Sequence, residues 1–242
     1  MIETFSSRSE LLLGPESTAL LAASRVAVFG LGGVGSWAVE ALARSAIGSF
    51  LLVDNDTVAP SNCNRQLVAT HSTVGRLKVA VMKERVLDIN PAASVDTAPV
   101  FIGQDTIDII DFSAFDYVLD CIDTVSAKLL IAERCQDAGT PLLSCMGTGN
   151  RIHADGFIIT DIGKTKTCPL ARVMRRELKK RGIQHLQVLY SPDECFRTRS
   201  VLIDNERPVP GSVSFVPPVA GLLLAGELVR QLLQKSRTEK QD

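Results

Sequence analysis

The sequence has little that would suit a secreted, membrane-spanning or strongly polyanion-binding protein. Residues 1–9 contain no apolar core, which predicts neither a signal peptide nor a membrane anchor. The longest apolar stretch, residues 213–226, contains two prolines and ends before Glu227, short of the roughly 20 residues that a spanning helix needs. A formal net charge of −1 gives no overall attraction for nucleic acid, so any such contact requires a local basic patch. We therefore expect a cytoplasmic protein without a membrane partner.

Cysteine pairs of the kind that bind structural zinc are also missing. No two of the six cysteines form a C-x-x-C pair. Scattered cysteines in a chain without a predicted signal peptide are more often reduced than bridged. We interpret most of them as free thiols that fill the core, at positions Cys63, Cys121, Cys135, Cys145, Cys168 and Cys195.

The 242 residues, 45% hydrophobic and 22% charged, suit one large α/β domain. Short apolar runs predict strands at residues 25–29, 49–53, 94–100, 117–121, 141–145, 156–160 and 186–190. Helical patterns lie at residues 36–45, 73–89, 125–138, 169–181 and 217–233. This alternation predicts a Rossmann-like, doubly wound, mostly parallel sheet, with an antiparallel extension toward the C-terminus formed by the strand at 156–160.

A glycine-rich turn joins the first predicted strand to the following helix. Gly30, Gly32, Gly33 and Gly35 match the G-x-G-x-x-G pattern, which lets backbone N–H groups approach a phosphate at a helix N-terminus. Asp54 ends the next strand, where a carboxylate can accept hydrogen bonds from ribose hydroxyls. The turn therefore predicts a nucleotide site, but it does not distinguish ATP from NAD.

The residues after the second strand favour a triphosphate. Arginine and lysine can clamp phosphates, and asparagine can hold phosphate oxygens or a hydrated metal. Lys78 taken alone also suits a solvated helix face. The polar cluster comprises Asp56, Asn62, Asn64, Arg65, Gln66 and Lys78.

Two further carboxylates, Asp120 and Asp123, close the strand at 117–121 and precede a helix. Ligands bind at the carboxyl ends of the strands of such sheets. We expect Asp120 to cap the helix and Asp123 to reach Mg²⁺ on the phosphates.

These motifs resemble, in order, those of the adenylyltransferases that activate ubiquitin-like and sulfur-carrier proteins. The resemblance implies that ATP and Mg²⁺ are handled by Gly33, Asp54, Asn62, Asn64, Arg65, Lys78 and Asp123. It also implies a homodimer in which Arg8 reaches the partner's site, and it leaves a monovalent cation open as a further ligand. It divides the single adenylating domain, residues 1–242, into a nucleotide-binding part at about 20–150 and a substrate-binding, crossover and C-terminal part at about 151–235.

The second half, at residues 161–172 and 210–217, looks like the tRNA threonylcarbamoyladenosine dehydratases. That resemblance implies adenylation of the threonyl carboxylate of a modified adenosine in tRNA, followed by cyclisation with loss of water. A basic helix provides a candidate RNA phosphate track, because Arg172, Arg176 and Lys179 share one face and Lys164 lies upstream. A solvated charged face is the alternative interpretation.

Three other functions remain open from the sequence. The first is an adenylyltransferase that activates the C-terminal glycine of a small sulfur-carrier protein, and a sulfur-transfer partner stays open with it. The second is an NAD-dependent oxidoreductase, against which Arg65 and Lys78 argue. The third is a non-catalytic interaction module that keeps the fold.

Overall fold

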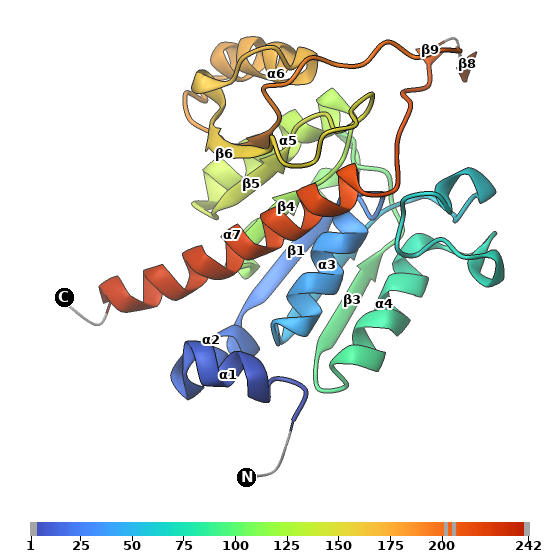
Figure 1. Cartoon of the computed structure of the whole chain (residues 1–242). Coiled ribbons are helices and arrows are strands. Elements are labelled where there is room, and N and C mark those ends of the chain that lie inside the picture. Colours follow the sequence, from blue (N-terminus) through green and yellow to red (C-terminus); the bar gives the residue numbers. More distant parts are fainter. Residues whose placement is uncertain (1–3, 201–202, 205–206, 240–242) are drawn as a thin grey trace.

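The structure is a computed structural model that describes residues 4–200, 203–204 and 207–239. Its strands are β1 (Arg25–Phe29), β2 (Ser49–Val53), β3 (Ser94–Ala98), β4 (Tyr117–Asp120), β5 (Leu142–Cys145), β6 (Ile158–Asp161), β7 (Gln187–Tyr190), β8 (Ile203–Asp204) and β9 (Arg207–Pro208). Its α-helices are α1 (Ser7–Leu13), α2 (Pro15–Ala23), α3 (Gly35–Arg44), α4 (Lys78–Ile89), α5 (Val125–Ala138), α6 (Pro169–Lys180) and α7 (Val216–Glu239), shown in Figure 1.

One seven-stranded sheet organises the molecule, in the order β3-β2-β1-β4-β5-β7-β6. Its strands run parallel except β6, which pairs antiparallel with β7 at the edge. The strand order reverses between β1 and β4, and ligands bind beside the carboxyl ends at such a switch point. The predicted Rossmann-like fold with an antiparallel extension is confirmed.

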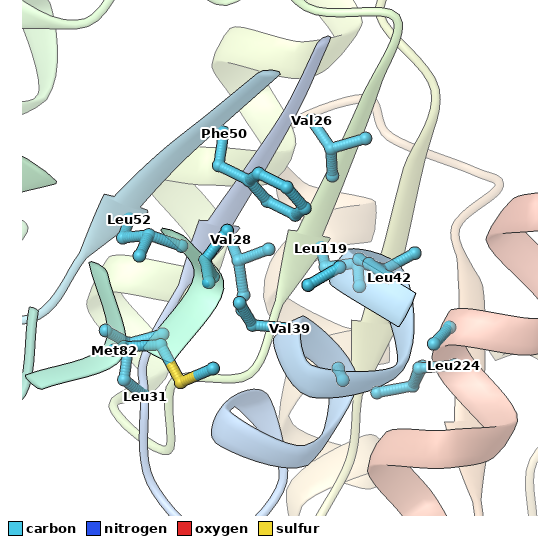
Figure 2. Packing of buried hydrophobic residues seen from close by; sticks show 14 of the residues in the cluster. Val26, Val28, Leu31, Val39, Leu42, Phe50, Leu52, Met82, Leu119 and Leu224 are labelled. Carbon is cyan, nitrogen blue, oxygen red and sulfur yellow. The ribbon is translucent and has the colours of Figure 1, made fainter. Parts of the chain in front are cut away.

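Both faces of the sheet are buried, as a doubly wound fold requires. Val26 and Val28 of β1 belong to a core that includes residues of α3, α4 and α7. Ala27 and Phe29, which alternate with them, belong to the core beneath α5. Figure 2 shows the first core from close by. A third core lies between α5 and α6 and closes the same side of the sheet under β7.

The helix predicted at residues 73–89 begins later than the pattern indicated. Residues 71–73 form a short 3-10 turn and α4 starts at Lys78. Two local features delay it. Gly75 has a φ of +86°, which is left-handed, and Leu77 forms a β-bridge with Thr57. Lys78 is consequently the first residue of its helix, facing the end of β2.

The two ends of the chain contain more helix than predicted. The sequence analysis assigned no element before Arg25, where the structure has α1 and α2. The apolar segment near the C-terminus is also longer than expected, because Pro217 and Pro218 lie in the first turn of α7, where missing N–H groups cost nothing. Among the described residues, one stretch, Val216–Lys235, is therefore long and apolar enough to cross a membrane, and half of it is buried. The expectation that this apolar segment is too short for a membrane-spanning helix was wrong.

Candidate active site

A cavity of about 950 Å³ opens at the carboxyl ends of the parallel strands, at the switch point between β1 and β4. Its walls come from the glycine turn after β1 and from the segments after β2, β3, β4 and β5. The loops that lead into the N-terminal ends of α6 and α7 complete them. Of the predicted site residues, it is lined by Gly30, Gly32, Gly33, Asp54, Asp56, Asn62, Arg65, Gln66, Lys78 and Asp123.

The glycine turn is shaped by close backbone contacts. Gly30 has a φ of +85°, and a Cβ there would lie 2.9 Å from the carbonyl of Cys121. Gly35 begins α3, and a Cβ at this residue would overlap the carbonyl oxygen of Gly30, so Gly35 shapes the turn without lining the cavity. The N–H groups of Gly32 and Gly33 donate to nothing within the described residues. These free donors at the start of a helix suit a phosphate.

Asp54 connects the turn to the second strand. Its Oδ2 accepts a hydrogen bond from the N–H of Leu31 at 2.6 Å, and its Oδ1 accepts from that of Asp56 at 2.8 Å. Burial raises the pKa of Asp54, an effect that nearby Lys78 partly opposes. Each carboxylate oxygen keeps a second lone pair for a ribose hydroxyl.

Lys78 is buried, so it is not a solvated-face lysine. Its side chain is only 6% exposed, and its Nζ donates to Oδ2 of Asp56 at 2.7 Å. An ammonium group has three donors, so this pair leaves two for phosphate oxygens. The structure therefore places a fixed positive charge on the cavity wall.

Arg65 and Gln66 complete that wall. The Nη1 of Arg65 donates to the carbonyl of Ser61 and to Oδ1 of Asn64, and burial lowers the pKa of Arg65. Gln66 is 7% exposed and its Oε1 has no hydrogen-bond partner within the described residues. A buried acceptor of this kind is costly unless a ligand supplies the donor.

The two asparagines of the cluster also serve the local structure. Oδ1 of Asn62 accepts from the N–H of Ala59, which stabilises the 3-10 turn at Pro60–Asn62. Asn64 does not line the cavity, and its Nδ2 donates to the carbonyl of Ser212. Their contacts to phosphate stay predictions.

The two carboxylates after β4 occupy different environments. Asp120 does not cap α5, whose N-cap is Thr124, because its own carboxylate is fully buried against Lys128 at 2.8 Å and accepts from Ser144. Lys128 also donates to the carbonyl of Ile122 at 2.9 Å and so braces the turn that carries Asp123. Asp123 itself is exposed and lines the cavity, and its Oδ1 accepts one long hydrogen bond, from Oγ1 of Thr124 at 3.5 Å.

Arg151 is a cavity residue that sequence reasoning missed. It is 4% exposed, and its guanidinium donates to the carbonyls of Gly147, Ser191 and Asp193. These bonds join the loop after β5 to the loop after β7. In the sheet, β5 and β7 lie on the other side of β1 from β2, the strand that precedes Lys78 in the chain. Its position after Gly147 and Gly149, just beyond a predicted strand, was the available signal.

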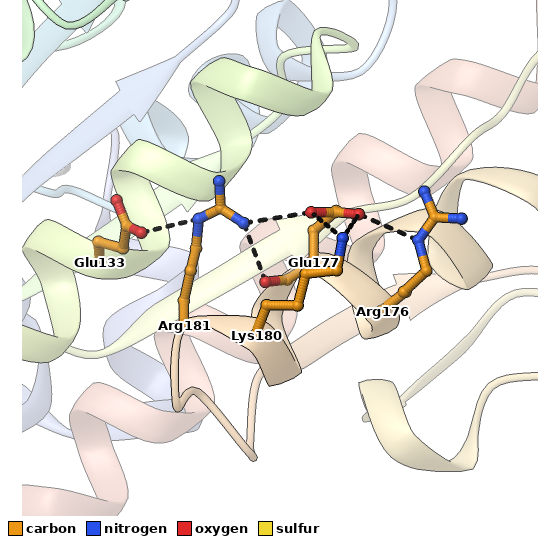
Figure 3. A network of polar contacts seen from close by, with 5 residues as sticks. All are labelled: Glu133, Arg176, Glu177, Lys180 and Arg181. Atoms are coloured by element: carbon orange, nitrogen blue, oxygen red, sulfur yellow. Dashed lines mark hydrogen bonds and ion pairs between the residues drawn. The ribbon is translucent and has the colours of Figure 1, made fainter.

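The basic helix forms as predicted and keeps Arg172, Arg176 and Lys179 exposed. Glu177 neutralises part of it: Figure 3 shows its carboxylate paired with Arg176, Lys180 and Arg181. Arg172 and Lys179 have no such partner within the described residues. Lys164 lies apart from the nucleotide cavity, beside a second cavity of about 580 Å³.

The remaining predicted features are Arg8 and the six cysteines, of which Cys121, Cys145, Cys168 and Cys195 line the cavity. Arg8, on α1, is exposed and does not line the cavity of its own chain. The cysteines are free thiols, as expected; Cys63 and Cys195 are exposed, and the others are buried or half-buried. Burial raises the pKa of Cys145 to about 12. Among the described residues, no group of three or more histidine, cysteine or acidic side chains is placed to hold a metal ion.

Comparisons with known proteins agree with this geometry. The ThiF family profile matches residues 7–242. The Bacillus subtilis (strain 168) tRNA threonylcarbamoyladenosine dehydratase is 42% identical over 97% of this chain and 96% of its own length. The crystal structure of the Escherichia coli tRNA N6-threonylcarbamoyladenosine dehydratase in complex with ATP is 30% identical, covers 96% of this chain and 94% of its own, and superposes with a TM-score of 0.87.

A third relative, the adenylyltransferase and sulfurtransferase UBA4 of Vanderwaltozyma polyspora, is 38% identical over 57% of this chain and 31% of its own length. Agreement with the dehydratases thus extends over nearly the whole chain, whereas agreement with the sulfurtransferase is restricted to a part of it. This chain belongs to the ThiF family, together with the tRNA threonylcarbamoyladenosine dehydratases.

Proposed function

We propose that this protein uses ATP to adenylate the threonyl carboxylate of N6-threonylcarbamoyladenosine in tRNA, and that the activated modification then cyclises. The observation that carries the proposal is a single cavity at the switch point that brings together the glycine turn, Asp54, Arg65, Lys78 and Asp123. Relatives named for this dehydration match over nearly the full chain, and one of them has been solved with ATP.

The reaction requires placement and charge neutralisation rather than a protein nucleophile. A carboxylate oxygen of the threonyl group attacks the α-phosphorus of ATP, and pyrophosphate leaves. An atom of the same modification then attacks the activated carbonyl, AMP leaves, and the ring closes with the net loss of one water. Arg65 and Lys78 stabilise the negative charge that gathers on the phosphates, and the N–H groups of Gly32 and Gly33, which line the same cavity, are further donors for it.

Mg²⁺ bound with ATP supplies further neutralisation of the phosphate charge, and the residue we assign to it is Asp123. The fit rests on the chemistry of the site: Asp123 is an exposed carboxylate on the cavity wall, and Lys128 fixes the turn beneath it. A monovalent cation remains open as an additional ligand.

The wider setting is part of the proposal. We expect a cytoplasmic homodimer that binds tRNA, in which residues from about 20 to 150 hold the nucleotide and residues from about 151 to 235 meet the substrate. We expect no membrane attachment, because half of the apolar stretch of α7 is already buried in the protein. The alternative is adenylation of the C-terminal glycine of a sulfur-carrier protein, and a sulfur-transfer partner stays open with it.

The experiment combines the purified protein, ATP and tRNA that carries the uncyclised modification. We expect tRNA-dependent release of AMP and pyrophosphate, and loss of one water from the modified nucleoside by mass spectrometry. Changing Lys78→Ala should lower turnover on the order of 10²-fold or more. Lys83→Ala, on the same helix but outside the cavity, is the matched control and should retain activity. Pyrophosphate exchange that depends on a carrier protein and ignores tRNA would support the alternative instead.

A further inference from the structure

Phe196 is a large apolar side chain that stands in solvent at the edge of the nucleotide cavity. It is 53% exposed, and the residue before it, Cys195, lines the cavity. Exposed phenylalanine gives up the burial that makes the residue favourable in a folded protein. Its position beside the site therefore suggests a ligand that covers it.

The backbone that carries Phe196 is fixed to the cavity wall. The N–H of Phe196 donates to the carbonyl of Asn150 at 2.7 Å. Asn150 has a left-handed φ of +57°, its N–H donates to the carbonyl of Gly211 at 2.7 Å, and its Oδ1 accepts from the N–H of Gly211 at 2.6 Å. Asn150 thus joins three loops that are distant in sequence, and all three line the cavity. The backbone at Phe196 is thus anchored to the loops that form the cavity wall.

The surface around Phe196 is basic. Arg197 and Arg199 follow it in the same loop and are exposed. The start of α6 is bound to this loop, because Oγ1 of Thr167 donates to the carbonyl of Pro192 at 2.7 Å. Lys166, the residue before Thr167, is exposed as well.

The acidic side chains of the loop offset this charge only in part. Asp193 is turned inward, where its Oδ2 accepts a hydrogen bond from Oγ of Ser191 at 3.0 Å. Glu194 is exposed, so among the described residues of this loop one exposed acid accompanies the exposed Arg197 and Arg199, and the exposed Lys166 adjoins the loop through Thr167. An aromatic face among cations suits a nucleic-acid strand better than an apolar protein segment, because the cations neutralise phosphates while the ring stacks on a base.

We propose that Phe196 is a stacking platform for the base that adjoins the modified adenosine in the RNA strand. The inference rests on the proposed function and names a contact for that substrate. The modified adenosine enters the cavity, its phosphates pass Lys166, Arg197 and Arg199, and the neighbouring base lies on the Phe196 ring. Stacking on an aromatic side chain is tolerant of base identity, so Phe196 contributes affinity for an unpaired strand more than for a sequence.

The test compares two probes that differ by the flanking nucleotides, with their bases and their phosphates. One is the N6-threonylcarbamoyladenosine nucleoside, and the other is a trinucleotide that has the same nucleoside at its centre. Equilibrium dialysis against the full-length protein with an ATP analogue that cannot be cleaved between the α- and β-phosphates should show tighter binding of the trinucleotide. Phe196→Ala should weaken trinucleotide binding by roughly 5- to 150-fold, the range expected for one stacked base, and leave nucleoside binding unchanged.

Three variants provide the controls. Phe196→Trp keeps a π face and should retain trinucleotide affinity, with a change in tryptophan fluorescence on binding relative to the wild type. Ile109→Ala removes another exposed apolar side chain, 64% exposed and outside the cavity, and should change neither probe. Arg197→Ala should flatten the salt dependence of trinucleotide binding, whereas Phe196→Ala should leave the slope as it is.

The outcomes separate this inference from the proposed function. A wild-type protein that cyclises modified tRNA, with Phe196→Ala binding the trinucleotide as tightly as the wild type, overturns the stacking contact alone. A wild-type protein that ignores modified tRNA overturns both. Equal losses for the nucleoside and the trinucleotide would also refute the contact, because they would mean that the substitution damages the cavity and not a site beside it.

Discussion

At the scale of single residues, the buried carboxylate of Glu40 is paired with two arginines. Glu40 lies inside α3 with its side chain 8% exposed, and it accepts hydrogen bonds from Arg44 and from Arg85 of α4. Burial by itself raises the pKa of Glu40, but the hydrogen bonds from Arg85 and Arg44 outweigh it and leave the pKa lowered. The pair of Glu40 and Arg85 connects α3, which follows the glycine turn, to α4, which begins at Lys78.

The lowered pKa of Glu40 predicts a pH-dependent contribution to stability. A carboxyl group whose pKa is lower in the folded state than in the unfolded state stabilises the protein at pH values above its unfolded-state pKa. That contribution disappears as the pH falls through its folded-state pKa. Glu40→Gln should therefore cost roughly 1.5–3 kcal/mol at pH 7, the range for hydrogen bonds to charged groups. Urea unfolding from pH 7 downward should show the gap between wild type and variant closing below about pH 4.3.

The control for Glu40 is Glu84→Gln on α4. Glu84 also pairs with an arginine, Arg76, but its side chain is 63% exposed. Exposed pairs contribute little, so this variant should differ from the wild type by less than about 1 kcal/mol at either pH. A gap for Glu40→Gln that stays constant with pH would contradict the assignment.

At the scale of elements, α7 packs closely on α3, the helix that follows the glycine turn. Gly221 of α7 lies against α3 so closely that a Cβ would overlap the carbonyl oxygen of Val34 and come within 2.9 Å of the nitrogen of Ala38. At the start of the same helix, Pro217 lies against Gly33, where a Cβ would come within 3.0 Å of its ring. A displacement of α7 would therefore reach the glycine turn.

Two glycines of α7 give a matched pair. Gly221→Ala should destabilise the protein by about 1–3 kcal/mol, as overpacking does, and weaken ATP binding through the turn. Gly226→Ala meets nothing within 4 Å, so it should be neutral or stabilise by up to about 1 kcal/mol through helix propensity. Thermal unfolding and ATP titration of both variants measure this, and equal behaviour of the two would refute the close contact.

The basic face of α6 provides the second prediction for an element. If Arg172, Arg176 and Lys179 contact RNA phosphates, changing all three to alanine should weaken tRNA binding and leave ATP affinity unaltered. Each lost contact should also flatten the slope of log K against log salt by roughly 0.7 to 0.9. Arg134→Ala with Arg230→Ala removes the positive charges of a half-buried and an exposed arginine elsewhere and should alter the slope less. Because Glu177 already engages Arg176, we expect a change smaller than three full contacts.

At the scale of the whole molecule, one predicted site residue lies outside the cavity of its own chain. Arg8 is exposed on α1 and does not line its own cavity. Leu11 and Leu12 beside it are 78% and 85% exposed, and Leu222 of α7 is 47% exposed. Neighbouring apolar side chains in solvent suit an interface with a second copy, which would let Arg8 act on the partner's ATP.

Mixing two inactive variants tests a shared site. Arg8→Ala chains supply an intact cavity, and Lys78→Ala chains supply an intact Arg8. Heterodimers should contain one complete site and recover up to about half of the wild-type activity per dimer, while each variant alone stays inactive. Recovery should rise with the time allowed for subunit exchange. A mixture that remains as inactive as its components would exclude a contribution from the partner subunit.

The sequence by itself determined those parts of the protein that depend on neighbours along the chain. The glycine turn after β1, Asp54 at the end of β2 and the cluster around Arg65 each follow a predicted strand, and parallel strands present their carboxyl ends at one edge. Periodicity and turn residues therefore sufficed for the fold and for most of the cavity, and the order of the motifs carried the family resemblance.

Only the tertiary structure decided the features that join segments distant in sequence. Burial of Lys128 against Asp120, the bonds of Arg151 to the loop after β7, and the junction at Asn150 involve partners that no local pattern specifies. The late start of α4 came from a bridge between Thr57 and Leu77. Hydrogen bonds and desolvation depend on what surrounds an atom in space, and a chain sets those surroundings only when its strands and helices have packed together.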